Sequence, residues 1–127
     1  MHALGLTAHA ETPAAFLPQG EERKLGVARA LGTRPRFLLM DEPAAGLNEG
    51  EVPELASLIR SVREEHRVGV LLIDHNVPLI MGVCDRIHVL DEGHTIASGS
   101  PEEIRVNVEV TTAYLGRRGS TRGNEDA

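Results

Sequence analysis

Aromatic side chains are almost absent from this 127-residue sequence, which has two phenylalanines, one tyrosine and no tryptophan. Proteins that stack nucleic-acid bases or enclose quaternary amines rely on aromatic rings for those contacts. The scarcity of such rings argues against both functions. It also means that the hydrophobic core of this single-domain length of chain must be built from Leu, Val, Ile and Ala.

Cysteine, positive charge and long apolar runs are also scarce. The single cysteine, Cys84, excludes an internal disulfide, and no segment resembles a secretion signal or reaches the roughly 20 apolar residues that span a bilayer. The net charge of −6 and the lack of a Lys/Arg cluster argue against a nucleic-acid partner, because phosphate binding needs several cationic contacts. We therefore expect a cytoplasmic protein that can associate with a membrane only peripherally.

Several motifs of catalysis are missing as well. No phosphate-binding loop of the form GxxxxGK[ST] occurs in the sequence. No serine is framed by a nucleophile elbow, and Cys84 has no placed base beside it. The six histidines show no paired spacing of the zinc-binding type. A hydrolase triad and a zinc centre are therefore poor explanations of this sequence.

Hydrophobic periodicity, in contrast, predicts strands that alternate with helices after an irregular first sixteen residues. The expected strands are Phe37–Met40, Val68–Ile73 and Arg86–Leu90, with a hairpin strand at His94–Ser98. The expected helices begin near Pro18 and Pro53, cover Val77–Val83, begin again after Ser100, and end with a helix that carries Val110 and Tyr114. This alternation predicts a parallel α/β sheet with functional residues at the carboxyl ends of its strands.

Two adjacent carboxylates, Asp41 and Glu42, stand where the first strand ends. Because neighbouring anions repel each other, a metal, a cation or a hydrogen-bond network must compensate them, and Mg²⁺ with nucleotide phosphates would do so. In nucleotide hydrolysis an aspartate at such a place helps to hold Mg²⁺, and an adjacent carboxylate polarises the attacking water. The alternative is a solvated acid pair at a strand end.

His75 follows the second strand, so a parallel sheet would bring it to the same edge as Glu42. A neutral imidazole there can donate to a γ-phosphate oxygen or to the attacking water. The alternative is a surface histidine that caps the next helix. A third candidate is the pentapeptide LPQGE at 17–21, because free backbone N–H groups at a helix start can bind phosphate. Alone, it is equally well explained as an ordinary helix start.

Three segments taken in order resemble a known family: LPQGEERKLGVARAL, FLLMDEPAAGLN and LLIDHN. They are similar to the signature motif, the Walker B motif with its D-loop, and the H-loop of ABC-transporter ATPases. The segments EPAAGLN, MGVCDRIHVLDEG, IASGSPEEI and AYLG further resemble the ATP-binding subunit of branched-chain amino-acid importers of the Liv type. The resemblance runs from about Leu4 to Gly116 and implies a P-loop NTPase-like parallel sheet with flanking helices, truncated and without its Walker A half.

The resemblance also implies roles and partners. Asp41 would bind Mg²⁺, Glu42 would be the general base, and His75 would sense the γ-phosphate. The signature residues Leu17, Pro18, Gln19, Gly20 and Glu21 would meet ATP bound to a second ATPase subunit in a head-to-tail dimer, and the D-loop residues Ala45, Gly46, Leu47 and Asn48 would line that dimer interface. Membrane permease subunits would hold the dimer at the inner face of the cell membrane. Residues 1–34 would end the helical subdomain, residues 35–116 would belong to the ATPase core, and residues 117–127 would form a disordered tail.

The sequence departs from the family pattern at three positions. Pro18 stands where the signature LSGGQ has its serine, and Glu21 replaces the glutamine, which would turn an anion toward phosphate. Asp74 replaces the glutamate that is commoner before the histidine, which we interpret as a mild change.

The larger departure is the missing half. The family's Walker A loop, Q-loop and adenine-stacking aromatic residue have no counterpart here, and the missing central strand would leave two apolar strands with open edges. This leaves three interpretations: part of an ATP-hydrolysing importer subunit that binds ATP poorly alone, a non-catalytic interaction module or remnant, or one half of a split ATPase whose Walker A loop comes from a separate polypeptide.

Overall fold

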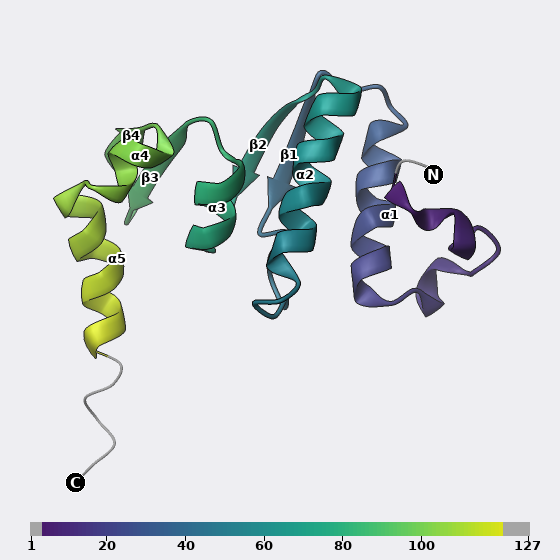
Figure 1. Cartoon of the computed structure of the whole chain (residues 1–127), viewed down its shortest axis with the longest axis horizontal. Helices are drawn as coiled ribbons and strands as arrows, with labels where there is room; N and C mark the ends of the chain where they lie inside the picture. Colours follow the sequence, from purple (N-terminus) through teal and green to yellow (C-terminus); the bar gives the residue numbers. More distant parts are fainter. Residues whose placement is uncertain (1–3, 121–127) are drawn as a thin grey trace, which may run out of the picture. The chain divides into compact units, whose positions relative to one another are not determined.

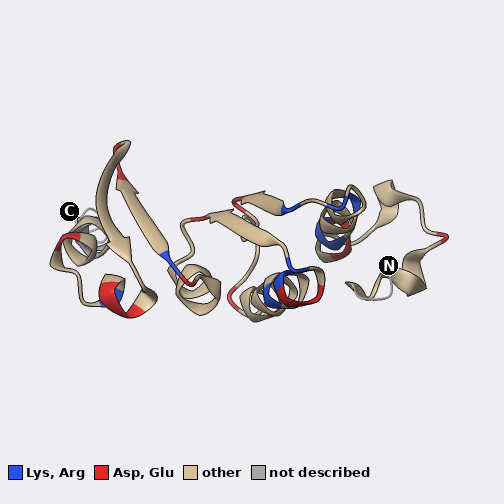
Figure 2. Cartoon of the chain, turned by 90° about the horizontal axis from the view of Figure 1, so that it is seen from above, with Lys and Arg blue, Asp and Glu red and all other residues tan. Residues whose placement is uncertain are grey.

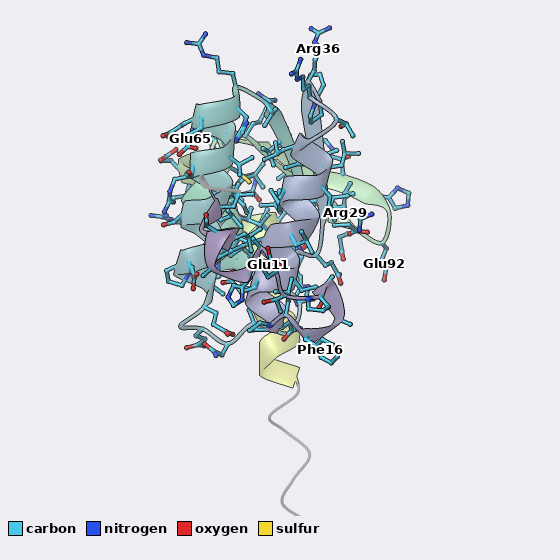
Figure 3. All side chains as sticks on the ribbon, turned by 90° about the vertical axis from the view of Figure 1, so that its right-hand side faces the viewer. Glu11, Phe16, Arg29, Arg36, Glu65 and Glu92 are labelled. Carbon is cyan, nitrogen blue, oxygen red and sulfur yellow. The ribbon has the colours of Figure 1, made fainter. Side chains whose placement is uncertain are left out.

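The structure of the protein is a computed structural model that describes residues 4–120. It divides into two compact units, Met1–Leu79 and Ile80–Ala127, which are described separately. Figure 1 shows the elements along the chain. The amino-terminal segment forms two short 3₁₀ helices, η2 (Leu6–His9) and η3 (Ala14–Phe16), as expected for an irregular start. Phe16 at its end is largely exposed (Figure 3).

The first unit is built on two parallel strands and two long helices. Strand β1 (Phe37–Asp41) pairs with β2 (Gly69–Ile73) in a register that sets Leu39 opposite Leu71 and Asp41 opposite Ile73. Helix α2 (Val52–His66) connects them and lies along one face of this sheet, with α1 (Gln19–Leu31) beside it (Figure 1). A helical crossover of this kind is what a parallel strand pair requires.

Local sequence signals explain where these helices start. Pro18 occupies the N-cap of α1, and two acidic residues in the first turn favour the positive end of the helix dipole. Pro53 lies in the first turn of α2, where its missing N–H removes no helical hydrogen bond. The expected starts near Pro18 and Pro53 are therefore confirmed.

The core of the first unit lies between α2 and one face of the sheet. Leu38 and Met40 alternate with exposed residues along β1 and are buried. The apolar stripe of α2 supplies the facing side chains, which are Leu55, Ala56, Ile59 and Val62. The other face of the sheet carries Phe37, Leu39, Leu71 and Ile73, each more than half exposed. Parallel sheets are almost always covered on both faces, so the exposure of this apolar face is unusual for a parallel sheet.

The second unit contains an antiparallel hairpin and two helices. Strands β3 (Ile87–Asp91) and β4 (His94–Gly99) form the expected hairpin, with a register irregularity between Val89 and Leu90. Helix α4 (Pro101–Arg105) starts at Ser100 with a complete capping box, and α5 (Val108–Ser120) follows it. Ile87, Val89 and Ile104 form the centre of the core of this unit. Helix α3 (Val77–Val83), which joins the two units in sequence, has the predicted bounds.

The expected α/β fold with a parallel sheet and flanking helices is confirmed. In the described part of the chain the parallel sheet holds only β1 and β2, because β2 pairs only with β1 and β3 pairs only with β4. Each of these strands is hydrogen-bonded along one edge only, so its other edge is open. Open edges of this kind are what the sequence analysis expects if a central strand is missing. Helix α5 extends to Ser120, so it includes residues 117–120, which the sequence analysis places in a disordered tail. Residues 121–127 lie outside the described residues.

Candidate functional site

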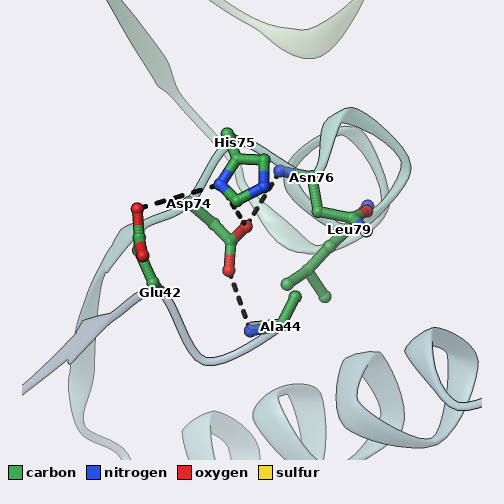
Figure 4. Close-up of polar contacts among 6 residues, drawn as sticks. All are labelled: Glu42, Ala44, Asp74, His75, Asn76 and Leu79. Carbon is green, nitrogen blue, oxygen red and sulfur yellow. Dashed lines mark hydrogen bonds and ion pairs between the residues drawn. The ribbon is translucent and has the colours of Figure 1, made fainter. Parts of the chain in front are cut away.

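Parallel pairing brings the two predicted catalytic side chains together. Asp41 is the last residue of β1, Glu42 follows it, and His75 comes two residues after β2. The Glu42 Oε1 atom lies 3.8 Å from His75 Nδ1, and both side chains are exposed, Glu42 to 59% and His75 to 76% (Figure 4). The pair is therefore open to a substrate at the carboxyl end of the sheet, where α/β proteins bind their ligands.

The backbone at Glu42 adopts an uncommon conformation. Its φ angle is +46°, a left-handed value that non-glycine residues rarely adopt, and its N–H donates to the carbonyl oxygen of Ile73 at 2.7 Å. The bond extends the contact between the strands by one residue beyond β1. The turn that follows passes through Ala44 and reaches Gly46, whose φ of +76° suits glycine. Strained backbone of this kind is found disproportionately at functional sites.

The D-loop turn also contacts the start of α1, which carries the signature segment. Arg23 donates a hydrogen bond to the carbonyl oxygen of Ala45 at 2.9 Å. A β-carbon added to Gly46 would lie 3.3 Å from the side-chain amide nitrogen, Nε2, of Gln19. The backbone at Gly46 therefore passes close to the Gln19 side chain. The predicted residues at 17–21 and 45–48 are thus neighbours within one chain. Most of them, including Pro18, Gly20 and Asn48, are exposed, and Leu17 and Leu47 are half-buried.

The Glu21 carboxylate, the anion in the predicted signature segment, is paired within the chain. Lys24 Nζ lies 3.0 Å from its Oε1 atom. Lys24 also lies 3.1 Å from Glu54 Oε1 on α2. The hydrogen bonds that Lys24 donates to Glu21 and, to a smaller extent, to Glu54 raise the pKa of Lys24 above its usual value. Acidic and basic residues are mixed along these two helices (Figure 2). The anionic substitution in the signature is therefore partly neutralised within the chain.

From the sequence alone, Asp74 is interpreted only as a mild change of residue type, but in the structure its side chain is buried and hydrogen-bonded. Its side chain has no exposed surface, and its two oxygens accept hydrogen bonds from the N–H groups of Ala44, at 2.9 Å, and Asn76, at 2.8 Å (Figure 4). Asn76, and not His75, caps the next helix, because its Oδ1 accepts the N–H of Leu79 at 2.9 Å. A sequence signal for the cap existed, since asparagine is a preferred N-cap residue and proline follows at Pro78.

The described carboxylates could supply only part of the ligands of a metal ion. Among residues 4–120, no group of three or more His, Cys, Asp or Glu side chains is arranged to hold a metal ion. Asp41 is exposed at the strand end and can offer carboxylate oxygens to a hard cation. Mg²⁺ in nucleotide sites is commonly held by one or two carboxylates together with phosphates and water. Asp41 therefore fits as one ligand of an ion that arrives with a nucleotide.

The comparisons with known proteins decide which family these motifs represent. The chain is 47% identical over 116 residues to the high-affinity branched-chain amino acid transport ATP-binding proteins LivG of Salmonella typhimurium and BraF of Pseudomonas aeruginosa. The match covers 91% of this chain and 46% of each relative. Residues 94–119 also match the family model described as branched-chain amino acid ATP-binding cassette transporter. This chain corresponds to the carboxyl-terminal region of a Liv-type ABC ATPase.

Solved structures support the same fold. The chain matches the ADP conformation of MJ1267, an ATP-binding cassette of an ABC transporter, with a TM-score of 0.80 at 24% identity, over 91% of this chain and 46% of that one. It matches CbiO1 from Clostridium perfringens, part of the ABC transporter complex CbiONQ, with a TM-score of 0.79 at 27% identity, over 94% and 49%. The Liv-type region described here thus spans about half the length of the curated relatives it matches.

The family match lets the motifs be named on the structure. The segment that resembles the Walker B motif is β1, the segment that resembles the D-loop is the turn at Ala45–Asn48, and the histidine that resembles that of the H-loop is His75. The described part of this Liv-type region contains no helix that is long and apolar enough to cross a membrane.

Proposed function

We propose that this chain supplies the general base, the Mg²⁺-binding carboxylate and the signature segment of an ABC-transporter ATPase that energises branched-chain amino-acid import. The observation that carries the proposal is the 3.8 Å approach of Glu42 to His75 at the open carboxyl end of a parallel strand pair. Both side chains are exposed and this close together, so a carboxylate and an imidazole can act on the same reacting group on the open side of the pair. The Liv-type relatives supply the substrate class.

In this proposal each residue has a separate task. Glu42 accepts a proton from the attacking water, and His75 donates to the γ-phosphate of ATP. Asp41 would hold Mg²⁺, which would supply positive charge next to the phosphates. The segment at 17–21 meets ATP held by a second ATPase subunit in a head-to-tail dimer, with Ala45–Asn48 at the interface. Permease subunits keep the dimer at the cytoplasmic face of the membrane.

The exposed face of the β1–β2 sheet favours a site that is completed by further polypeptide. Phe37, Leu39, Leu71 and Ile73 present a continuous apolar surface, and no strand of the described residues pairs with the outer edge of β2. Covering such a face is worth about 25 cal/mol for each Å² of apolar surface removed from water. We propose that a segment bearing a Walker A loop, in the same or a separate polypeptide, covers it and binds the phosphates.

The same face supports a second candidate, a non-catalytic module that docks on another ATPase. The two functions are separated by phosphate release. The full chain is mixed with a separately produced amino-terminal half of a Liv-type ATPase that carries the Walker A loop. We expect hydrolysis of MgATP only in the mixture, and a loss of about 100-fold or more with Glu42→Gln.

A matched control is available in Glu49→Gln, which makes the same chemical change at an exposed residue outside the site. This variant should hydrolyse ATP as the unaltered chain does. Stable complex formation without hydrolysis would favour the docking module. Hydrolysis that survives Glu42→Gln would refute the assignment of the general base.

A further inference from the structure

The buried carboxylate of Asp74 lies beside the candidate catalytic pair without belonging to it. Its side chain has no exposed surface, while Glu42 and His75 are both mostly exposed. A buried carboxylate is tolerated only when hydrogen bonds or cations compensate for its lost hydration. The groups that donate hydrogen bonds to the Asp74 carboxylate therefore identify the segments that this residue holds in place.

Two backbone N–H groups on different segments provide that compensation. Asp74 Oδ2 accepts the N–H of Ala44 at 2.9 Å, and Oδ1 accepts the N–H of Asn76 at 2.8 Å (Figure 4). Asn76 in turn accepts the N–H of Leu79 at the start of α3. Hydrogen bonds to an ionised acceptor are stronger than those between neutral groups. One side chain thus joins the turn after β1, the end of β2 and the start of α3.

This arrangement fixes the backbone that carries Glu42. The N–H of Glu42 is bonded to Ile73, and two residues later the N–H of Ala44 is bonded to Asp74. The left-handed φ angle of Glu42 is therefore held from both sides against β2. Asp74 Oδ1 lies 3.9 Å from His75 Nδ1, which is too long for a hydrogen bond, so its influence on the pair passes through the backbone.

We propose that Asp74 is a positioning residue that sets the distance between Glu42 and His75 by binding the Ala44 N–H. It contacts neither the nucleotide nor the attacking water. Without this bond the turn at Glu42–Ala44 loses one of its two attachments to β2, and the Glu42 carboxylate samples positions away from His75. A shift of about 1 Å in a catalytic group is sufficient to reduce a rate substantially.

The first test uses the full chain alone and does not depend on the proposed function. Amide hydrogen exchange is measured by NMR in the unaltered chain, in Asp74→Asn and in the control Glu49→Gln. Asparagine keeps the shape of the side chain but offers one acceptor oxygen for two N–H donors. We expect the Ala44 amide of Asp74→Asn to exchange at least about tenfold faster, with Val62 in the α2 core unchanged and Glu49→Gln unaffected.

Two results would overturn the proposal. One is an Ala44 amide that is unprotected in the unaltered chain, which needs no variant. The other is an Asp74→Asn protein that is folded and shows no change in the Ala44 exchange rate or chemical shift. If Asp74→Asn does not fold, Asp74→Ser takes its place, because its short side chain keeps a hydroxyl but cannot reach the Ala44 N–H and the Asn76 N–H together. An undisturbed Ala44 amide in that variant would again refute the role.

The second test uses the ATP-hydrolysing mixture and rests on the proposed function. Asp74→Asn should lower kcat with the KM for ATP unchanged, because nucleotide contacts are intact while Glu42 is misplaced. A raised KM with unchanged kcat would contradict a positioning role. Failure of the mixture to hydrolyse ATP would count against the proposed function and leave the exchange test decisive for Asp74.

Discussion

Replacement of Lys24 by glutamine should destabilise the first unit by about 1–2 kcal/mol. Lys24 bridges Glu21 on its own helix and Glu54 on α2, at 3.0 and 3.1 Å. Exposed ion pairs contribute about 0–1 kcal/mol, whereas breaking a buried pair costs about 3–5 kcal/mol. The side chains of Lys24 and Glu21 are 20% and 21% exposed, so their pair falls between these limits. The second oxygen of Glu21 is buried with no hydrogen-bond partner, which makes the loss of Lys24 more costly.

Urea unfolding followed by far-ultraviolet circular dichroism measures this effect. With a denaturant dependence of about 2 kcal/mol/M, the midpoint should fall by about 0.5–1 M. The matched control is Glu54→Gln, which removes only the partner that is 69% exposed and should cost at most about 0.5 kcal/mol. Equal midpoints for Lys24→Gln and Glu54→Gln would refute the reasoning that partial burial makes the Glu21 pair the stronger one.

The same interaction predicts a pH dependence. The Glu21 and Glu54 carboxylates raise the pKa of Lys24 above the ordinary 10.5, so the folded state binds this proton more tightly than the unfolded state does. The stabilisation is therefore fully present below the unfolded pKa and is lost as the pH rises through the folded pKa. The difference in midpoint between the unaltered chain and Lys24→Gln should be constant near neutral pH and shrink above about pH 10.5. A difference that shrinks between about pH 7 and 9 would contradict this.

Two further predictions concern local packing. Ser100→Ala removes the hydroxyl that accepts the Glu103 N–H at 3.2 Å in the capping box of α4. This variant should lower the free energy of unfolding, measured in urea, by about 0.5–2 kcal/mol. The control Glu102→Ala, which lies outside the capping box, should lower it by less. Gly69→Ala places a β-carbon 2.6 Å from the Phe37 ring and should cost about 1 kcal/mol as the ring moves away. In a Phe37→Ala background the same change should be neutral or stabilising, and a double-mutant cycle without coupling would show that the ring is not the obstacle.

Local sequence signals were sufficient for most of the secondary structure. Proline near the helix starts and serine at position 100 act within one helical turn, so their effects can be inferred without knowledge of the rest of the chain. The juxtaposition of Glu42 and His75 also followed from the sequence, because it needs only two parallel strands with polar residues after each. Pairing of β3 with β4 alone could not be inferred from the alternation of elements, since it depends on which strands are available across the sheet.

The roles of individual polar side chains were less accessible. Glu21 and Lys24 are three residues apart on a helix, so their ion pair has a sequence signal, but the link to Glu54 depends on how α1 packs beside α2. Asp74 gave no signal beyond a conservative change of residue type. Its burial and its bond to Ala44, thirty residues earlier, arise from the tertiary fold.

At Glu42, the left-handed backbone conformation favours one kind of residue, whereas the proposed role requires another. Gly or Asn adopts this conformation more readily, so either substitution would relieve roughly 1 kcal/mol of strain. Both substitutions would remove the carboxylate. Selection for stability alone would therefore favour losing Glu42, and a screen for more stable variants of this chain should recover changes at position 42 that remove the proposed general base.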